Sequence, residues 1–216
     1  MTKILYEDTH LLLIEKPMGV PSQDGEGDCI PRRLTNQGYT VKVVHRLDKP
    51  TGGVMVYART DAAAAKLSAL VGQHHLFVKE YLAVVQGSPA ESESTFTDLL
   101  YHDVRKNKSY AVDRMRKGVR EAKLDYAVLE TAATEEGVFS LVCVRLHTGR
   151  THQIRVQFAS RKMPLYGDSR YGGVKGGTLG LWSHRLTLPH PVTGKTISAQ
   201  SDPDWDGAPW CYFKEV

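Results

Sequence analysis

The chain has 216 residues, 41% of them hydrophobic and 24% charged, so it is expected to form one large domain or two small ones with an ordinary globular core. No apolar stretch reaches the ~18 residues needed to span a bilayer, and the N-terminus lacks the order of a signal peptide. Three scattered cysteines make neither a disulfide framework nor a CxxC metal site. We therefore expect a cytoplasmic protein with no membrane contact and no metal.

The net charge of +4 is unevenly distributed along the chain. Between residues 103 and 123 there are eight Lys or Arg residues against three Asp or Glu residues, whereas acidic groups collect elsewhere. Segregated positive charge is typical of polyanion binders, because neutralised phosphates release their counterions. The segment is expected to contact nucleic acid. The simpler alternative is a solvated loop with a chance excess of lysine.

The N-terminal part of the chain predicts short strands and one long loop. Residues 2–6 and 10–15 have strand length and composition, and a loop rich in Gly and Pro follows over residues 16–29. Two further strands are predicted over residues 41–45 and 53–58. They flank the polar sequence RLDKPTG, which is therefore expected to be a connecting loop.

The middle of the chain predicts one helix and then a β-rich region. Thr60 can cap a helix over residues 61–72, in which the apolar residues share one side and Gly72 ends the pattern. Apolar or alternating runs then indicate consecutive strands. The strands predicted there are residues 77–87, 94–102, 121–130 and 138–146.

A second helix is predicted to begin at Thr151 and to end before Pro164, followed by a loop and a late strand over residues 181–191. Many neighbouring strands with few helices favour an α+β fold over a parallel doubly wound one. We expect a mixed, mostly antiparallel central β-sheet flanked by a few helices and loops, in a single domain over residues 1–216.

Several chemistries are excluded by spacing. The TGKT sequence at residues 193–196 would need its first P-loop glycine where Pro189 stands. His147 and His152 are five residues apart across a glycine, an awkward spacing for one metal ion. There is also no GxSxG motif, which argues against acyl transfer.

One polar cluster lies between two predicted strands. In the sequence HRLDKPTGG, Asp48 follows Arg46 and precedes Lys49 and Pro50. Proline extends the residue before it, and the glycine pair permits a tight turn, so the carboxylate is expected on a rigid loop. An isolated Asp in such a turn often bonds its own backbone instead, and this structural alternative stays open at this point.

Two other clusters change that balance. Arg150 precedes the expected start of the second helix, where free N–H groups attract anions and an arginine could pair with a carboxylate from another loop. Lys79 and Tyr81 alternate along a predicted strand and share one face. Taken singly, the first could be a capped amphipathic helix with a basic outer face, and Tyr81 could be a core tyrosine.

The order of these clusters resembles the RluA-type pseudouridine synthases. HRLDKPTGG resembles their HRLDxxTSG signature, KEYLAVV their KxYxAxV motif, and GRTHQIRVQ their GRTHQIRVH motif. EKPMGVPSQ near the N-terminus is similar to their KPxGxxxH loop. The motifs occur in family order over residues 15–195. Because they begin so early, we expect a member without the separate N-terminal S4 RNA-binding domain of many relatives.

The resemblance implies a pseudouridine synthase fold and an RNA isomerase that needs no cofactor. Residue by residue, Asp48 corresponds to the catalytic aspartate, Tyr81 to the tyrosine that packs on the target base, and Arg150 to the partner of the aspartate. Ile154 corresponds to the apolar wall of the base pocket, and Arg46 to an arginine near the space that the flipped nucleotide leaves. The residues expected to bind RNA or the base are Arg46, Lys79, Gln153, Ile154 and Arg155.

The partner is accordingly expected to be a stem-loop of ribosomal or transfer RNA, bound by a monomer. Cleavage of the glycosidic bond builds positive charge on the sugar, which one carboxylate can stabilise or attack. Two alternatives remain at this stage. A base-excising hydrolase would leave an abasic site, and a non-catalytic RNA-binding factor would leave the RNA unchanged.

Overall fold

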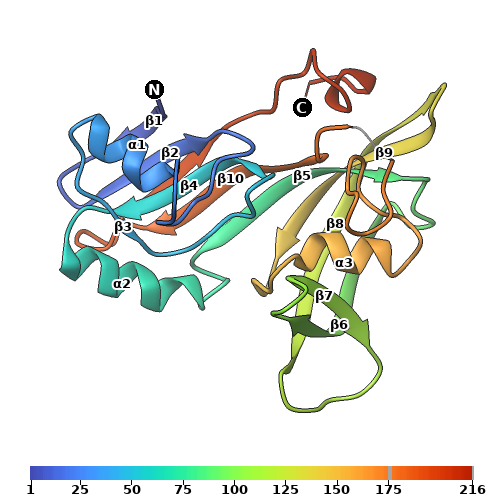
Figure 1. Cartoon of the computed structure of the whole chain (residues 1–216), viewed down its shortest axis with the longest axis horizontal. Coiled ribbons are helices and arrows are strands. Elements are labelled where there is room, and N and C mark those ends of the chain that lie inside the picture. The colour runs from blue at the N-terminus through green and yellow to red at the C-terminus, as the bar shows by residue number, and fades with distance from the viewer. Residues whose placement is uncertain (175–176, 216) are drawn as a thin grey trace. The chain divides into compact units, whose positions relative to one another are not determined.

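A computed structural model describes residues 1–174 and 177–215 of the chain (Figure 1). The chain divides into two compact units, each built from two separate chain segments. Unit 1 comprises Met1–Glu80 and Trp182–Pro203, and unit 2 comprises Tyr81–Leu181 and Asp204–Val216. No helix among the described residues is long and apolar enough to cross a bilayer.

Unit 1 contains a sheet whose strands pair mostly antiparallel. The antiparallel pairs are β1 with β2, β2 with β4, β3 with β4, and β10 with β11, whereas β4 and β10 run parallel. The strands are β1 (Lys3–Glu7), β2 (Leu11–Lys16), β3 (Lys42–Val43), β4 (Gly52–Ala58), β10 (Leu181–Pro189) and β11 (Thr196–Gln200).

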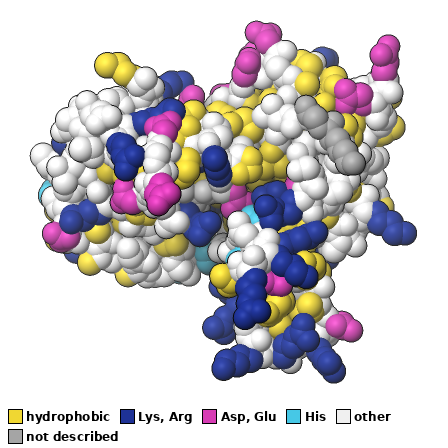
Figure 2. Space-filling view, in the orientation of Figure 1, with side chains coloured by type: hydrophobic (Ala, Val, Ile, Leu, Met, Phe, Trp, Pro, Cys, Tyr) yellow, Lys and Arg dark blue, Asp and Glu magenta, His cyan; other side chains and the backbone are white. Residues whose placement is uncertain are grey.

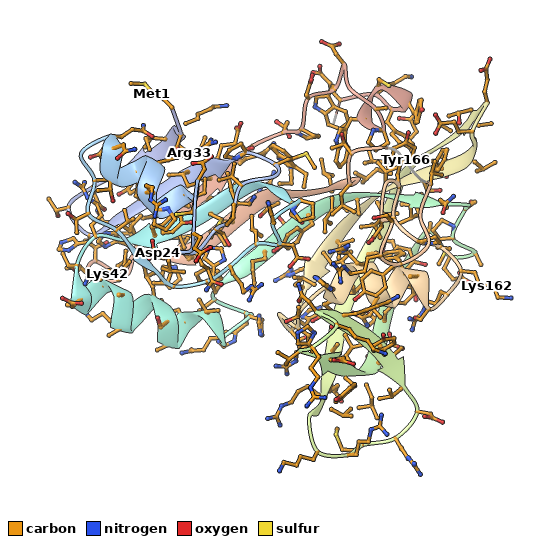
Figure 3. The ribbon with its side chains drawn as sticks, in the orientation of Figure 1. Met1, Asp24, Arg33, Lys42, Lys162 and Tyr166 are labelled. Carbon is orange, nitrogen blue, oxygen red and sulfur yellow. The ribbon has the colours of Figure 1, made fainter. Side chains whose placement is uncertain are left out.

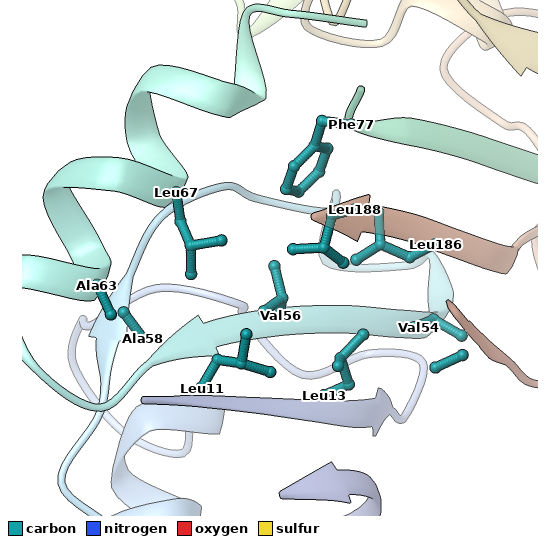
Figure 4. Packing of buried hydrophobic residues seen from close by; sticks show 11 residues of the cluster. Leu11, Leu13, Val54, Val56, Ala58, Ala63, Leu67, Phe77, Leu186 and Leu188 are labelled. Atoms are coloured by element: carbon teal, nitrogen blue, oxygen red, sulfur yellow. The ribbon is translucent and has the colours of Figure 1, made fainter. Parts of the chain in front are cut away.

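The core of unit 1 lies between this sheet and helix α2 (Asp61–Val71) (Figure 4). The hydroxyl of Thr60 accepts a hydrogen bond from the Ala63 N–H at 3.2 Å, which caps the helix as its sequence predicts. Leu67 on α2 packs with apolar residues of β2, β4 and β10 that are excluded from solvent. This packing removes apolar surface from water and fixes β4, the strand that leaves the Asp48 loop.

Unit 2 is built on antiparallel strands in the order β9–β8–β6–β7. Strand β6 pairs with β7 and β8, and β8 pairs with β9. Its strands are β5 (Val78–Gln86, which begins in unit 1), β6 (Glu93–Asp103), β7 (Lys108–Val112), β8 (Val119–Thr134) and β9 (Gly137–Leu146). Helix α3 (Gln153–Ala159) contacts β6 and β7, and a short 3₁₀ helix η1 (Trp210–Tyr212) lies near the C-terminus.

Aromatic rings fill the core of unit 2. Phe158 on α3 packs edge-on against Phe96, with ring centroids 5.2 Å apart, and against Tyr126 at 5.5 Å. Tyr166, labelled in Figure 3, packs similarly against Phe139 at 5.4 Å. Such edge-to-face pairs stabilise the core in addition to the burial of apolar surface, and they fix α3 on the sheet formed by β6–β9.

The predicted fold class is confirmed, because both units combine a mostly antiparallel set of strands with few helices, and β4–β10 adds a parallel pair. The sequence prediction omitted α1 (Ile30–Asn36), β7 and β11. Pro31 lies in the first turn of α1, a position that proline favours, and could have indicated this helix. The Gly- and Pro-rich residues before it favoured a loop instead.

The start of α3 differs from the prediction by two residues. The helix was expected to begin at Thr151, but it begins at Gln153 because His152 has a left-handed backbone with φ +56°. The side chain of Gln153 instead accepts hydrogen bonds from the Arg150 N–H at 3.0 Å and the Thr148 hydroxyl at 2.7 Å. This local network replaces an ordinary threonine cap.

Candidate active site and RNA-contact surface

Asp48 lies on the loop between β3 and β4, in unit 1, and its side chain is half-buried. The loop is anchored on both sides of Asp48. Ser22 exchanges two hydrogen bonds with the backbone of the buried Leu47, and the Thr51 N–H donates to the Asp48 carbonyl at 3.0 Å. This turn contact joins two backbone groups and differs from the side-chain cap of the structural alternative, so it leaves a chemical role for the Asp48 carboxylate open.

Lys16 at the end of β2 is the main anchor of this loop. Its side chain is fully buried, and its ammonium donates to the carbonyls of Pro17, Val20 and Lys49 at 2.9, 2.7 and 3.1 Å. Burial lowers the pKa of Lys16 to about 8, and the carboxylate of Asp48 acts in the opposite direction. Lys16 thus ties the loop after β2 to the loop that carries Asp48 and places a positive charge near the carboxylate.

Replacing Lys16 with Met is expected to lower the free energy of unfolding by about 2–4 kcal/mol, because three carbonyl oxygens lose a charged donor. Lys3→Met, at an exposed lysine that bridges to Glu15, is the control and should change stability by less than about 0.5 kcal/mol. Urea denaturation of both variants measures the difference. Equal stability of the two variants would show that Lys16 is not an anchor.

His45 and Lys79, also in unit 1, lie against the ring of Phe77. The His45 and Phe77 ring centroids are 5.5 Å apart, and the Lys79 ammonium lies 5.6 Å from the Phe77 centroid. The His45 Nε2 atom accepts a hydrogen bond from the Val56 N–H at 3.1 Å. Burial and the nearby Lys79 cation lower the pKa of His45 to about 3, so its ring is neutral.

The other residues expected to contact the target base or the RNA differ in solvent exposure. Arg46, next to Asp48 along the chain, is exposed, as an RNA-contacting residue would need to be. Tyr81 and Ile154 belong to unit 2 and are buried, with exposed fractions of 6% and 4%. Both side chains therefore have the low exposure of walls in an apolar pocket, and equally that of core residues.

Arg150 is exposed, and its guanidinium Nε donates to the carbonyl of Glu121 on β8 at 2.9 Å. Gln153, which follows on α3, is buried and uses both ends of its amide inside unit 2, since its Nε2 donates to the Lys123 carbonyl at 3.1 Å. The GRTHQIR segment is thus joined to β8 by two side chains. The conformation of this segment therefore depends on its contacts with β8 more than on a cap at the start of α3.

Arg155 is the buried arginine of the same segment. Its guanidinium makes two hydrogen bonds of 2.7 Å to the carboxylate of Asp168, whose side chain is fully buried. The ring of Tyr171 lies beside this pair, 5.3 Å from the Arg155 guanidinium carbon. The Tyr171 hydroxyl accepts from the Ser109 N–H at 2.8 Å and bonds His152 Nδ1 at 3.0 Å.

The basic arm, defined as residues 103–123, lies in unit 2 and comprises the end of β6, β7 and the start of β8. Figure 2 shows Lys and Arg side chains gathered where Figure 1 draws β6, β7 and the loop beside them. Most of its cations are exposed, and two lie over tyrosine rings, Lys108 over Tyr110 at 5.7 Å and Arg116 over Tyr101 at 5.4 Å. The arm therefore presents fixed positive charge and aromatic surface together.

Three residues of these networks were not predicted from sequence. Lys16 belongs to the KPxG-like loop and could have been singled out as a lysine inside an apolar strand. Asp168 and Tyr171 lie in a segment that the sequence predicts only as a loop, and their signal is limited to their spacing in GDSRYGG. Among the described residues, no group of three or more His, Cys, Asp or Glu side chains could hold a metal ion.

The mostly antiparallel fold and the order of the motif-bearing loops agree with the class of protein that the motifs indicate, an RNA-modifying isomerase. The RNA pseudouridylate synthase family profile matches residues 10–160, and the chain belongs to that family. It is 34% identical to the ribosomal large subunit pseudouridine synthase D of Xanthomonas campestris, over 92% of this chain and 65% of that protein. The tRNA pseudouridine synthase C of Yersinia pestis is 30% identical, over 96% of this chain and 89% of that protein.

A solved structure shares the fold. The structure of human RNA pseudouridylate synthase domain containing 1 has a TM-score of 0.81 and 23% sequence identity, covering 95% of this chain and 84% of that chain. The likeness confirms the expected pseudouridine synthase fold. The chain spans about two thirds of the length of several curated relatives that it matches.

Proposed function

We propose that this chain isomerises uridine in RNA to pseudouridine, with Asp48 as the catalytic carboxylate. The observation that carries the proposal is the anchored Asp48 loop, in a chain that belongs to the RNA pseudouridylate synthase family. One hydrogen bond from Lys16, to the Lys49 carbonyl, and two exchanged between Ser22 and the Leu47 backbone hold the residues on both sides of Asp48 in place. A catalytic group needs such a fixed position to act on one bond of its substrate.

The reaction requires a carboxylate, a shielded pocket and an extruded base. The N1–C1′ bond of uridine breaks, the uracil turns, and C5 joins C1′ while the C5 proton leaves. Asp48 stabilises the positive charge that develops during cleavage, or attacks directly. The freed uracil must be recaptured, so water has to be excluded by apolar walls, for which Tyr81 and Ile154 are proposed. Extruding a stacked base costs a few kcal/mol.

A guanidinium is proposed as the counter-ion that keeps Asp48 negative. The sequence favoured Arg150, and the burial of the two candidates supports Arg155 more strongly. Arg150 is exposed and already bonds the Glu121 carbonyl, whereas Arg155 is buried and held by Asp168. Turnover of Arg150→Ala and Arg155→Lys distinguishes the two assignments.

The RNA is proposed to be ribosomal or transfer RNA, which are the substrate classes named for the two relatives above. Arg46, two residues before Asp48 along the chain, is exposed and is proposed to contact the site from which the base is extruded. Gln153 is proposed to act mainly by holding the GRTHQIR segment, because both ends of its side-chain amide are occupied inside unit 2. Lys79 is proposed to bind RNA directly.

Mapping of pseudouridine in cellular RNA tests the function and names the substrate. RNA is compared with and without the gene, and the deleted cells are complemented with wild type or with Asp48→Asn. A site that disappears on deletion and returns only with wild type supports the proposal. Abasic sites at that uridine would instead indicate a hydrolase, and an unchanged map would indicate a binding factor.

Reversing the charge of three exposed residues on the basic arm, Arg105, Arg114 and Lys117, to Glu is expected to weaken RNA binding and flatten its salt dependence. Three lost phosphate contacts reduce the slope of log Kd against log salt by about 2. The control reverses three exposed lysines outside the arm, Lys66, Lys195 and Lys214. Fluorescence anisotropy at several salt concentrations measures both slopes. Equal slopes in the two variants would remove the arm from the RNA interface.

A further inference from the structure

Lys79 is a buried cation that pairs with no anionic side chain among the described residues. Its exposed fraction is 6%, and its ammonium makes no hydrogen bond or ion pair within residues 1–174 and 177–215. Its contact there is with the ring of Phe77, labelled in Figure 4, which belongs to the core of unit 1. A buried charge is costly unless it is paired, so the presence of this charge calls for a partner that the described residues do not supply.

His45 places a second donor in the same cluster. Its Nε2 accepts the Val56 N–H, and the ring is neutral, so the ring proton must sit on Nδ1. No acceptor for this Nδ1–H is found in the described part of the chain. His45 and Lys79 both contact Phe77, and the Lys79 cation is close enough to His45 to lower the pKa of the imidazole.

We propose that His45 and Lys79 form an oxyanion site for a phosphate group of the RNA substrate. The ammonium supplies the charge and the Nδ1–H a directed hydrogen bond, which together suit a phosphate oxygen. Burial also lowers the pKa of Lys79 to about 8, which leaves the ammonium mostly protonated at neutral pH. The site lies on the segment that leads into the Asp48 loop, since His45 precedes Asp48 by three residues. The proposal rests on the proposed function for its choice of RNA as the source of the phosphate.

The charge of Lys79 can be tested separately from the packing of its side chain. A carboxylate of the protein would neutralise the Lys79 ammonium in both the free and the ligand-bound protein. A bound phosphate neutralises the ammonium only in the complex. Met has nearly the length of Lys and no charge, so Lys79→Met removes the costly charge and preserves the packing on Phe77. We expect this variant to melt at the same temperature as wild type or higher, which separates loss of binding from loss of folding.

Inorganic phosphate tests the anion site independently of catalysis. In a protein with ¹⁵N-labelled histidine, phosphate is expected to shift the His45 Nδ1 resonance of wild type, with a Kd at least about tenfold weaker in Lys79→Met, as expected for a lost charge-assisted hydrogen bond. Lys66→Met, an exposed lysine of α2, is the matched control and should retain the wild-type Kd. An unshifted His45 signal, or equal Kd values in both variants, would overturn the site.

A fluorescent ten-residue oligouridylate then identifies RNA as the source of the phosphate. Lys79→Met is expected to flatten the slope of log Kd against log salt by about 0.7, the value for one phosphate contact on a single strand, and Lys66→Met should not. Phosphate binding with an unchanged RNA slope would overturn the RNA assignment in favour of free phosphate. Wild type that isomerises uridine but fails the phosphate test would refute this site alone and leave the proposed function intact.

Discussion

Replacing Asp48 with Asn is expected to reduce the rate of uridine isomerisation by at least about 10³-fold, because Asn keeps the shape of the side chain but removes its negative charge. The loop should keep its conformation, since hydrogen bonds of Lys16, Ser22 and the backbone hold it. Binding of RNA should therefore change little, and the loss should fall on turnover.

Tritium release measures this effect directly, because the C5 hydrogen of uridine leaves only when C5 joins C1′. RNA labelled with tritium at C5, containing the uridine identified by mapping, is incubated with each variant under single-turnover conditions. Asp24→Asn, at an exposed position in the loop after β2, is the matched control and should retain the wild-type rate. A rate for Asp48→Asn within tenfold of wild type would show that another group performs the chemistry.

Replacing Asp168 with Ala is expected to lower the free energy of unfolding by about 3–5 kcal/mol, because it leaves the buried Arg155 without the carboxylate that receives two of its hydrogen bonds. The exposed fractions of the two side chains are 7% and 0%, so solvent cannot take the place of the lost partner. If Arg155 is also the counter-ion of Asp48, as proposed above, the turnover of the folded fraction of this variant should fall as well.

The Asp98–Arg161 pair provides the control for this second prediction. Its distance is similar, 2.8 Å, but its side chains are 19% and 31% exposed, so water can replace part of the interaction. Asp98→Ala is therefore expected to cost clearly less than Asp168→Ala, on the order of 1–2 kcal/mol. Urea denaturation with equal m values compares them. A loss below about 1 kcal/mol for Asp168→Ala would mean that the buried pair does not hold the GRTHQIR segment.

Local sequence patterns were sufficient for most of the secondary structure. The alternation of apolar residues located β4, β5, β6, β9 and β10, and the Thr60 cap with Gly72 located α2, because these signals depend on residues within one or two turns or strand repeats. Helix α1 and the short strand β7 were missed because their sequences contain proline or a dense run of charges, which local rules assign to loops.

The sequence by itself determined the family, the order of the motifs and the carboxylate that is proposed to react, because these reside in short stretches of the chain. Only the tertiary structure decided which charged side chains are buried and what they meet. Lys16 bonds a carbonyl 33 residues away, Arg155 bonds Asp168 13 residues away, and Lys79 contacts a ring but no anion within the described residues. The cost of a buried charge depends on partners that folding brings from distant parts of the chain, and local sequence patterns carry no information about them.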